Sequence, residues 1–165
     1  MKVEVKLSGV DGILSTLKSL PPEVVSKRGG PVKLALAKGA RVIRDEAKKN
    51  LLASIARNGS ESTGLLEKNL IVSRGKAPND GKGERYLVRV KRQTYEKPEG
   101  ASSKPVTTLK TAHLLEYGSQ HQPATPWLRP AFAATKQKAT DVVINDLKSR
   151  IDKIVAKLAK QNASK

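Results

Sequence analysis

The alternation of apolar and charged residues along the chain predicts three β-strands. Residues 1–7 place apolar side chains at every second position with charged ones between them, which is typical of a half-buried strand. Two further short apolar runs, at 70–73 and 86–92, predict two more strands. A connection rich in Gly, Pro and Lys separates these two runs. We therefore expect a small, mainly antiparallel sheet.

Apolar residues that recur at intervals of three and four predict three helices. A short helix occupies residues 13–20 and ends at two prolines. A long central helix begins at Pro31 and ends before the turn Asn58-Gly59-Ser60. The last helix runs from Pro130 to about residue 159, and its apolar stripe consists of Phe132, Ala139, Val143, Leu147, Ile151, Ile154 and Leu158.

The order of these elements predicts an α+β fold in a single domain, residues 1–165. The small antiparallel sheet would be packed by the long central helix and by the long C-terminal helix. A helix over about 130–160 would extend roughly 45 Å, which is more than a domain of this size needs. We expect its far end to project or to pack on a neighbouring subunit. The segment 94–110 has no sustained period, and we expect it to be a flexible loop.

The amino-acid composition gives the chain a strong positive charge. The 165 residues include 32 Lys and Arg against 15 Asp and Glu, which gives a net charge of +17. The excess is spread through the whole chain and not gathered in a tail, so a solvated basic surface and a phosphate-binding surface are about equally consistent with it. Because aromatic residues make up only 3% of the chain, we expect an aliphatic, helix-rich body that completes its burial against partners.

Several classes of protein are disfavoured by what the chain lacks. Without cysteine it has no disulfide, no thiolate metal site and no cysteine nucleophile. No apolar run approaches the about 20 residues needed to cross a bilayer, so we expect neither a membrane partner nor an export signal. No serine lies in a nucleophile elbow, and the glycines form no phosphate loop. We therefore expect no enzymatic activity, no catalytic residue and no cofactor.

Three potential metal ligands, His113, Glu116 and His121, occur within nine residues. However, Gly118 separates the last two, and no further histidine or acidic cluster completes a site. A structural role for His113 and a solvated turn for His121 are much better interpretations. We expect no metal site.

A DNA-binding role would depend on charge alone. Zinc-finger spacing requires cysteine, no aromatic pair offers a base-stacking surface, and no short helix-turn-helix unit is evident. Any contact with DNA would therefore be made to phosphates, without sequence preference and with strong salt dependence. The candidates for contact with DNA or with an acidic protein are basic residues on polar faces of the predicted elements: Arg41, Arg44, Arg89 and Lys91.

The most distinctive stretch is 113–132, which predicts a rigid corner leading into the last helix. Leu115 and Tyr117 supply apolar anchors before a turn at Gly118, and prolines stiffen the connector that follows. Most of this stretch needs no further role than that corner. Glu116 is the exception, because an acid between leucine and tyrosine is expected to be half buried. It would then pair with an arginine, either Arg129 or one from a neighbouring subunit.

Four short motifs follow one another along the chain and are more specific together than separately. They are Gly39-Ala40-Arg41-Val42-Ile43-Arg44-Asp45-Glu46-Ala47, Thr63-Gly64-Leu65-Leu66, Leu115-Glu116-Tyr117-Gly118, and the proline-rich run from Pro123 through Pro126-Trp127-Leu128-Arg129-Pro130 to Phe132. In this combination the chain resembles the tail-component family of long-tailed bacteriophages, to which the lambda tail-completion protein is similar. The stretch 75–110 departs from the family pattern because it is longer and more basic.

The resemblance implies a structural protein of the virion, located in the phage tail or neck and in the host cytoplasm during assembly. The chain would be one subunit of a closed homo-oligomeric ring that completes the tail end and allows head joining and genome passage. Neighbouring head-completion and tail-terminator rings are the implied partners, and double-stranded DNA passing through the ring is a further candidate. The alternative is a small DNA-binding protein without sequence specificity.

Overall fold

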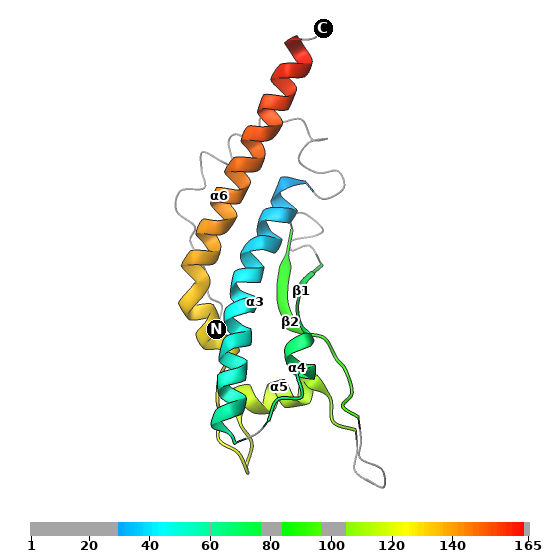
Figure 1. The fold of residues 1–165 in the computed structure, drawn as a ribbon, viewed down its shortest axis with the longest axis vertical. Helices are drawn as coiled ribbons and strands as arrows, with labels where there is room; N and C mark the ends of the chain where they lie inside the picture. The colour runs from blue at the N-terminus through cyan, green and yellow to red at the C-terminus, as the bar shows by residue number, and fades with distance from the viewer. Residues whose placement is uncertain (1–29, 60, 77–83, 97–104, 164–165) are drawn as a thin grey trace.

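A computed structural model describes residues 30–59, 61–76, 84–96 and 105–163. The strand expected over 1–7 and the helix expected over 13–20 lie outside the described residues. The described elements, coloured along the chain in Figure 1, are α3 (Pro31–Arg57), α4 (Leu65–Lys68), β1 (Leu70–Arg74), β2 (Tyr86–Val90), α5 (Thr108–Tyr117) and α6 (Leu128–Ala163).

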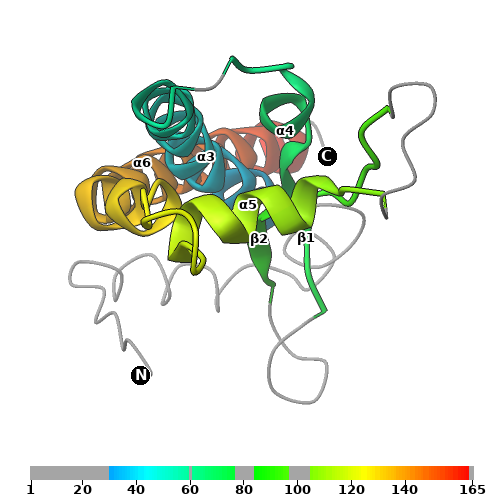
Figure 2. The same cartoon turned by 90° about the horizontal axis from the view of Figure 1, so that it is seen from below.

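Two long helices and a β-hairpin form the body of the described chain. In Figure 1, α3 lies between α6 and the hairpin, and it contacts both. β1 and β2 pair antiparallel, from Leu70 opposite Val90 to Arg74 opposite Tyr86. Figure 2, seen from below, shows α5 crossing the end of this assembly. The α+β fold, with its small antiparallel sheet and two long helices, is therefore confirmed.

The main hydrophobic core lies where α3, α5, the hairpin and the start of α6 meet. Its buried members come from every one of these elements and from α4, so it joins segments far apart in sequence: Ala47, Leu51, Leu66, Leu70, Ala112, Leu115, Trp127 and Ala131. A second cluster lies further along the two long helices and contains Ala35, Leu147 and Ile151. The stripe predicted for α6 faces α3 through Val143, Leu147 and Ile151, but its first member, Phe132, is 40% exposed. On α3, Ala35 and Gly39 face α6.

Several boundaries predicted from the sequence are corrected by the structure. The expected loop 94–110 is wrong at its carboxyl end, because α5 begins at Thr108 with the Thr107 hydroxyl accepting from the Lys110 amide. Thr94 and Thr107 also form a β-bridge across this segment. Residues 97–104, the middle of the expected loop, lie outside the described chain. The four-residue α4 and the ten-residue α5 were not predicted as helices.

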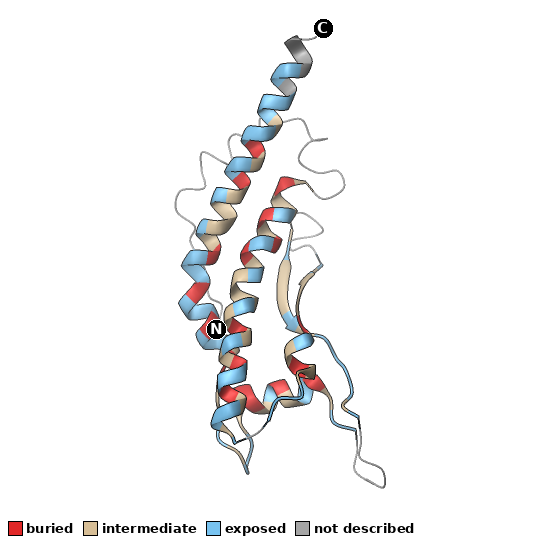
Figure 3. Ribbon diagram, viewed as in Figure 1, coloured by how far each residue is buried: buried red, intermediate tan, exposed pale blue. Residues whose placement is uncertain are grey.

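The far end of α6 extends past the start of α3 (Figures 1 and 3). Ile151 is the last buried residue described on α6, and most side chains described after it are exposed. In the packed part of α6, before Ile151, Asp146 links the two long helices. It accepts a hydrogen bond from Lys38 of α3 at 2.8 Å and one from Arg150 of α6. The hydrogen bonds from Arg150 and Lys38 lower the pKa of Asp146 below its ordinary value.

Gly39 marks a close approach of α3 to α6. A Cβ atom added there would overlap Val143 Cγ2 and would lie 2.9 Å from the Ala139 carbonyl oxygen of α6. No space therefore remains for a methyl group. The Gly39-Ala40 pair in the central helix has a packing reason that the sequence alone did not reveal.

We expect Gly39→Ala to destabilise the protein by about 1–2 kcal/mol, because overpacking outweighs the gain in helix propensity. Ala53→Gly on the exposed side of α3 is the control, and it should lose only the propensity difference of about 1 kcal/mol. Urea unfolding of both variants measures the two effects. A more stable Gly39→Ala protein would show that the helices do not meet closely there.

Candidate assembly interface

The motif residues at 115–130 form a closed corner between α5 and α6. Leu115 and Trp127 are buried in the main core, whereas Tyr117, Pro126 and Pro130 are exposed. Leu128 is half-buried and packs against the same core. Most of the motif is therefore framework, and only part of it is available to another molecule.

The carboxylate of Glu116 holds the amino end of α6. Its Oε2 atom accepts from the Trp127 amide at 2.8 Å and from the Leu128 amide at 2.9 Å. Its Oε1 atom accepts from the Arg129 amide at 3.2 Å and from Arg129 Nε at 2.8 Å. The first amides of a helix have no intrahelical partner, and Pro130 has no amide to satisfy. Glu116 thus caps α6 from a different helix.

This capping gives Glu116 a pKa below its ordinary value. Burial by itself raises the pKa, but the hydrogen bonds from the Leu128 and Trp127 amides and from Arg129 outweigh that effect. The positive end of the α6 dipole also lowers this pKa, because it stabilises the charged carboxylate. The expected pairing of Glu116 with Arg129 is therefore present within one chain, and Glu116 is more deeply buried than expected, at 5% exposure.

Polar residues of α3 hold the connector that precedes Trp127. The Ser54 hydroxyl donates to the Thr125 carbonyl at 2.7 Å, and Asn58 Nδ2 donates to Thr125 Oγ1 at 3.0 Å. Asn50 Nδ2 reaches the Trp127 carbonyl at 3.3 Å. Sequence reasoning missed these residues. Their signal was the spacing of four, which places Asn50, Ser54 and Asn58 on one side of the helix beside the apolar stripe.

Gly118 makes the turn at the end of α5 possible. Its φ of +77° and ψ of −174° lie in a region that only glycine adopts readily. A Cβ atom at this position would also lie 2.8 Å from the Ala124 amide nitrogen. The Gly118 amide donates to the Leu114 carbonyl and closes the helix. Both conformation and space therefore require glycine here.

The exposed rim of the corner is aromatic and basic. Tyr117 is 59% exposed, and the guanidinium of Arg129 lies 4.9 Å from the centre of its ring. The ring centroids of His113 and Tyr117 lie 4.7 Å apart. His121 is exposed in the turn after Gly118. Within the described ranges, no three His, Asp or Glu side chains are grouped as metal ligands.

The Thr63-Gly64 motif is a local turn before α4. Gly64 adopts a φ of +72° as the residue before the helix, and the Thr63 hydroxyl accepts from the Leu65 amide at 3.4 Å. Leu66 enters the main core. Thr63 itself is exposed and lines a hollow of about 320 Å³ together with Leu66 and Leu115. The motif therefore positions the start of β1 and lies beside the corner at 115–130.

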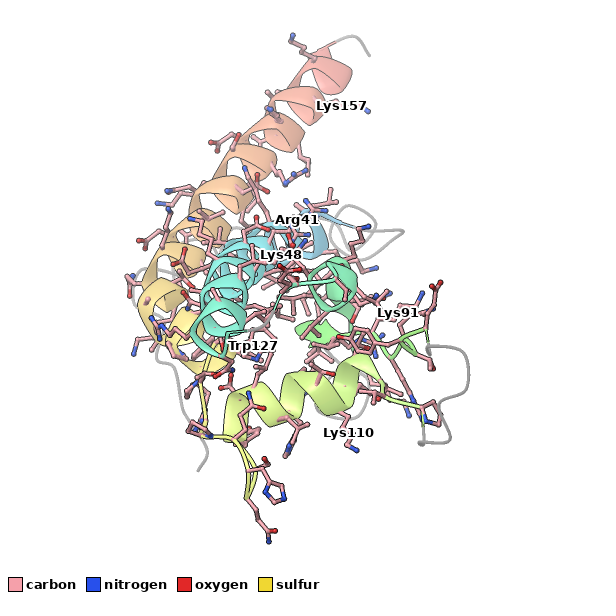
Figure 4. All side chains as sticks on the ribbon, turned by 60° about the horizontal axis from the view of Figure 1, so that its bottom comes forward. Arg41, Lys48, Lys91, Lys110, Trp127 and Lys157 are labelled. Carbon is pink, nitrogen blue, oxygen red and sulfur yellow. The ribbon has the colours of Figure 1, made fainter. Side chains whose placement is uncertain are left out.

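The four predicted contact residues come from two parts of the fold, α3 and the end of β2. Arg41 is exposed on α3, whereas Arg44 pairs with Asp45 at 2.7 Å. Arg89 and Lys91 are exposed at the end of β2. Figure 4 labels several exposed or partly exposed cations: Arg41 and Lys48 on α3, Lys110 on α5, Lys157 on α6, and Lys91 directly after β2. The sequence prediction of an evenly spread charge agrees with this arrangement.

An apolar groove, called the α3–α6 groove here, runs along the two long helices next to β2. A hollow of about 420 Å³ is lined by residues of α3 and α6 and by Glu84, Arg85 and Tyr86. An adjoining hollow of about 380 Å³ shares Ala40, Ile43, Tyr86 and Phe132 with it. Phe132 is 40% exposed at this groove. Two of the five aromatic side chains in the chain therefore line one apolar surface.

No protein-family model matches the chain, and no curated protein or solved structure matches it significantly. Among the helices that the structure describes, none is long and apolar enough to cross a membrane.

We expect Glu116→Gln to lower the free energy of unfolding by about 2–3 kcal/mol at neutral pH, because buried amides lose a charged acceptor. The folded-state pKa of Glu116 is lowered, so its stabilisation is complete above the unfolded value and is lost as pH falls through the folded pKa. The difference between wild type and variant should therefore shrink below pH 4.5, the ordinary value. Urea unfolding between about pH 2 and 7 measures it. A difference that does not vary with pH would contradict the capping role.

We expect Gly118→Ala to destabilise the protein by about 3 kcal/mol or more, because strain and overlap add. Gly59→Ala is the matched control, since Gly59 has a φ of +64° but nothing within 4 Å of an added Cβ atom. That control should lose about 1 kcal/mol. Equal losses in the two thermal or urea unfolding curves would show that Ala124 does not confine this turn.

Proposed function

We propose that this protein is a structural subunit of the phage head–tail junction, which assembles into a closed ring that completes the tail end. The proposal begins with the resemblance of four ordered motifs to the tail-component family. In this role the protein joins the tail to the filled head and lets the genome pass, and it catalyses no reaction. Its partners are copies of itself and the adjoining head-completion and tail-terminator rings.

The observation that carries the proposal is the amount of apolar surface left on an elongated, helix-based subunit. Phe132 and Tyr86 line the α3–α6 groove, while Leu34 of α3 is 49% exposed and Val155 of α6 is 47% exposed. Exposed apolar groups distributed over different faces suit a subunit that has more than one neighbour. In a closed ring, each copy offers one face to the next copy and a different face to the previous one.

The net charge of +17 fits this role as a property of the whole surface. A chain that bound DNA as its main function would gain most from cations gathered along one track. The labelled cations in Figure 4 are distributed over α3, α5, α6 and the residue after β2, and only Arg41 and Lys48 share an element. The charge is therefore better suited to acidic neighbouring proteins and to DNA passing through a lumen than to a dedicated DNA-binding surface.

Negative-stain images of the purified protein at increasing concentration test the proposal. We expect rings of uniform diameter, because a closed ring fixes the number of subunits. Phe132→Asp should reduce ring formation strongly, because it places a charge in the α3–α6 groove. Leu109→Asp is the control, since Leu109 is 45% exposed on α5 and does not line that groove.

Two results would count against the proposal. A protein that stays monomeric at every concentration, with or without added tails, would overturn the ring. Tight, salt-sensitive binding to DNA of any sequence in such a monomer would support the DNA-binding alternative instead. Rings that tolerate Phe132→Asp would retain the proposed function but exclude the α3–α6 groove as the subunit contact.

A further inference from the structure

The projecting end of α6 carries an apolar strip beyond the end of its partner helix. Leu147 and Ile151 are buried against Val32 and Ala35 of α3. α3 begins at Pro31, whereas α6 continues from Asp152 to Ala163, about 18 Å of further helix. α6 thus continues beyond the part that packs against α3.

The apolar pattern of α6 continues into this projecting part. Ile154 and Val155 follow Ile151 at intervals of three and four residues, so they lie on the same side of the helix as the packed strip. Ile154 is half-buried, and Val155 is 47% exposed. Figure 3 shows mostly exposed residues along this part of α6. The strip is therefore shaped for a helix but has no helix of the described chain against it.

A basic strip lies beside the apolar one. Arg150, Lys153, Lys157 and Lys160 recur at intervals of three, four and three residues and form a continuous row. Lys148 lies on the opposite flank of the apolar strip. Arg150 is engaged by Asp146, but no ion pair is formed by the other four within the described residues. Asp152 is the only acidic residue between 148 and 163.

These two strips together discriminate between possible occupants. A second copy packed strip against strip would bring cations close to cations, which disfavours pairing of α6 with itself. DNA would neutralise the basic row but would leave Ile154 and Val155 in water, because phosphates offer no apolar surface. A helix with an apolar strip flanked by Glu and Asp satisfies both features at once.

We propose that the projecting end of α6 docks an acidic amphipathic helix of an adjoining virion protein. This inference rests on the proposed function, and it names the surface and the chemistry of one partner. Ile154 and Val155 contact the apolar positions of that helix, and Lys153 and Lys157 pair with its carboxylates. Because these charges lie at the rim of the contact, they govern partner choice and association rate.

The test uses the full chain and two fluorescein-labelled helical peptides that share one Leu and Ile strip. One peptide carries Glu and the other Lys at the flanking positions, and a DNA duplex of about 20 base pairs is the third probe. Fluorescence anisotropy at physiological salt should show the Glu peptide binding at least about tenfold more tightly than the Lys peptide. Val155→Asp and the double variant Lys153→Glu/Lys157→Glu should each weaken the Glu peptide by about tenfold or more.

The double variant Lys110→Glu/Lys138→Glu is the matched control. It makes the same change of charge on exposed residues of α5 and of the packed half of α6, so it should change binding by less than about threefold. All four residues are exposed, and unchanged thermal unfolding will show that the variants are folded.

Each other outcome overturns the inference. Equal binding of the two peptides would show that the basic row does not select an acidic helix. Equal weakening by the control variant would show that binding depends on net charge and not on the projecting end of α6. Binding of DNA that resists Val155→Asp would make the row a phosphate contact, and self-association lost in Val155→Asp would make the strip a contact between copies. Ring formation in negative stain is scored separately. Rings without peptide binding would therefore overturn this inference alone, whereas the absence of rings would overturn the proposed function.

Discussion

The fold depends on the hydrogen bonds that the buried carboxylate of Glu116 accepts from the first residues of α6. Four hydrogen bonds from residues 127–129 converge on it, and the helix that they begin runs for 36 residues. A cap supplied by a neighbouring helix fixes direction as well as satisfying amides, because α5 and α6 must keep one relative position for the contacts to form. The Arg129 side chain is 60% exposed, so water screens its ion pair with Glu116 and the charge adds little stability. Arg129 contributes more through the fixed position of its hydrogen bonds to Glu116.

The corner is held from a second side by α3, and this makes the three helices one framework. The row Asn50, Ser54 and Asn58 binds the connector, while Gly39 lets the two long helices approach further along. Specific residues thus define the contact between α3 and α6 at the corner and part-way along the two helices. A rigid pair of helices can then present surfaces at its two ends and in its groove without losing its own core.

The residues discussed above fall into two groups, a structural framework and an exposed surface. Glu116, Gly118 and Trp127 have structural roles within the chain, whereas Tyr117, Phe132 and Val155 are exposed enough to meet other molecules. The first group supports the second, because another molecule binds best to a surface that the protein already holds in place. A widely distributed positive charge acts on the approach of any charged molecule over the whole surface.

The sequence by itself determined the strongly periodic elements: α3, α6, β1 and β2 follow from apolar spacing, and the α+β class follows from their order. It also indicated that Glu116 would seek an arginine. It did not reveal α4 or α5, since helices of four and ten residues carry few periodic positions. The cap of α6 by Glu116, the row on α3 that holds Thr125 and the close approach at Gly39 were decided only by the tertiary structure. Each joins residues distant in sequence, and no local pattern specifies which distant atoms will meet.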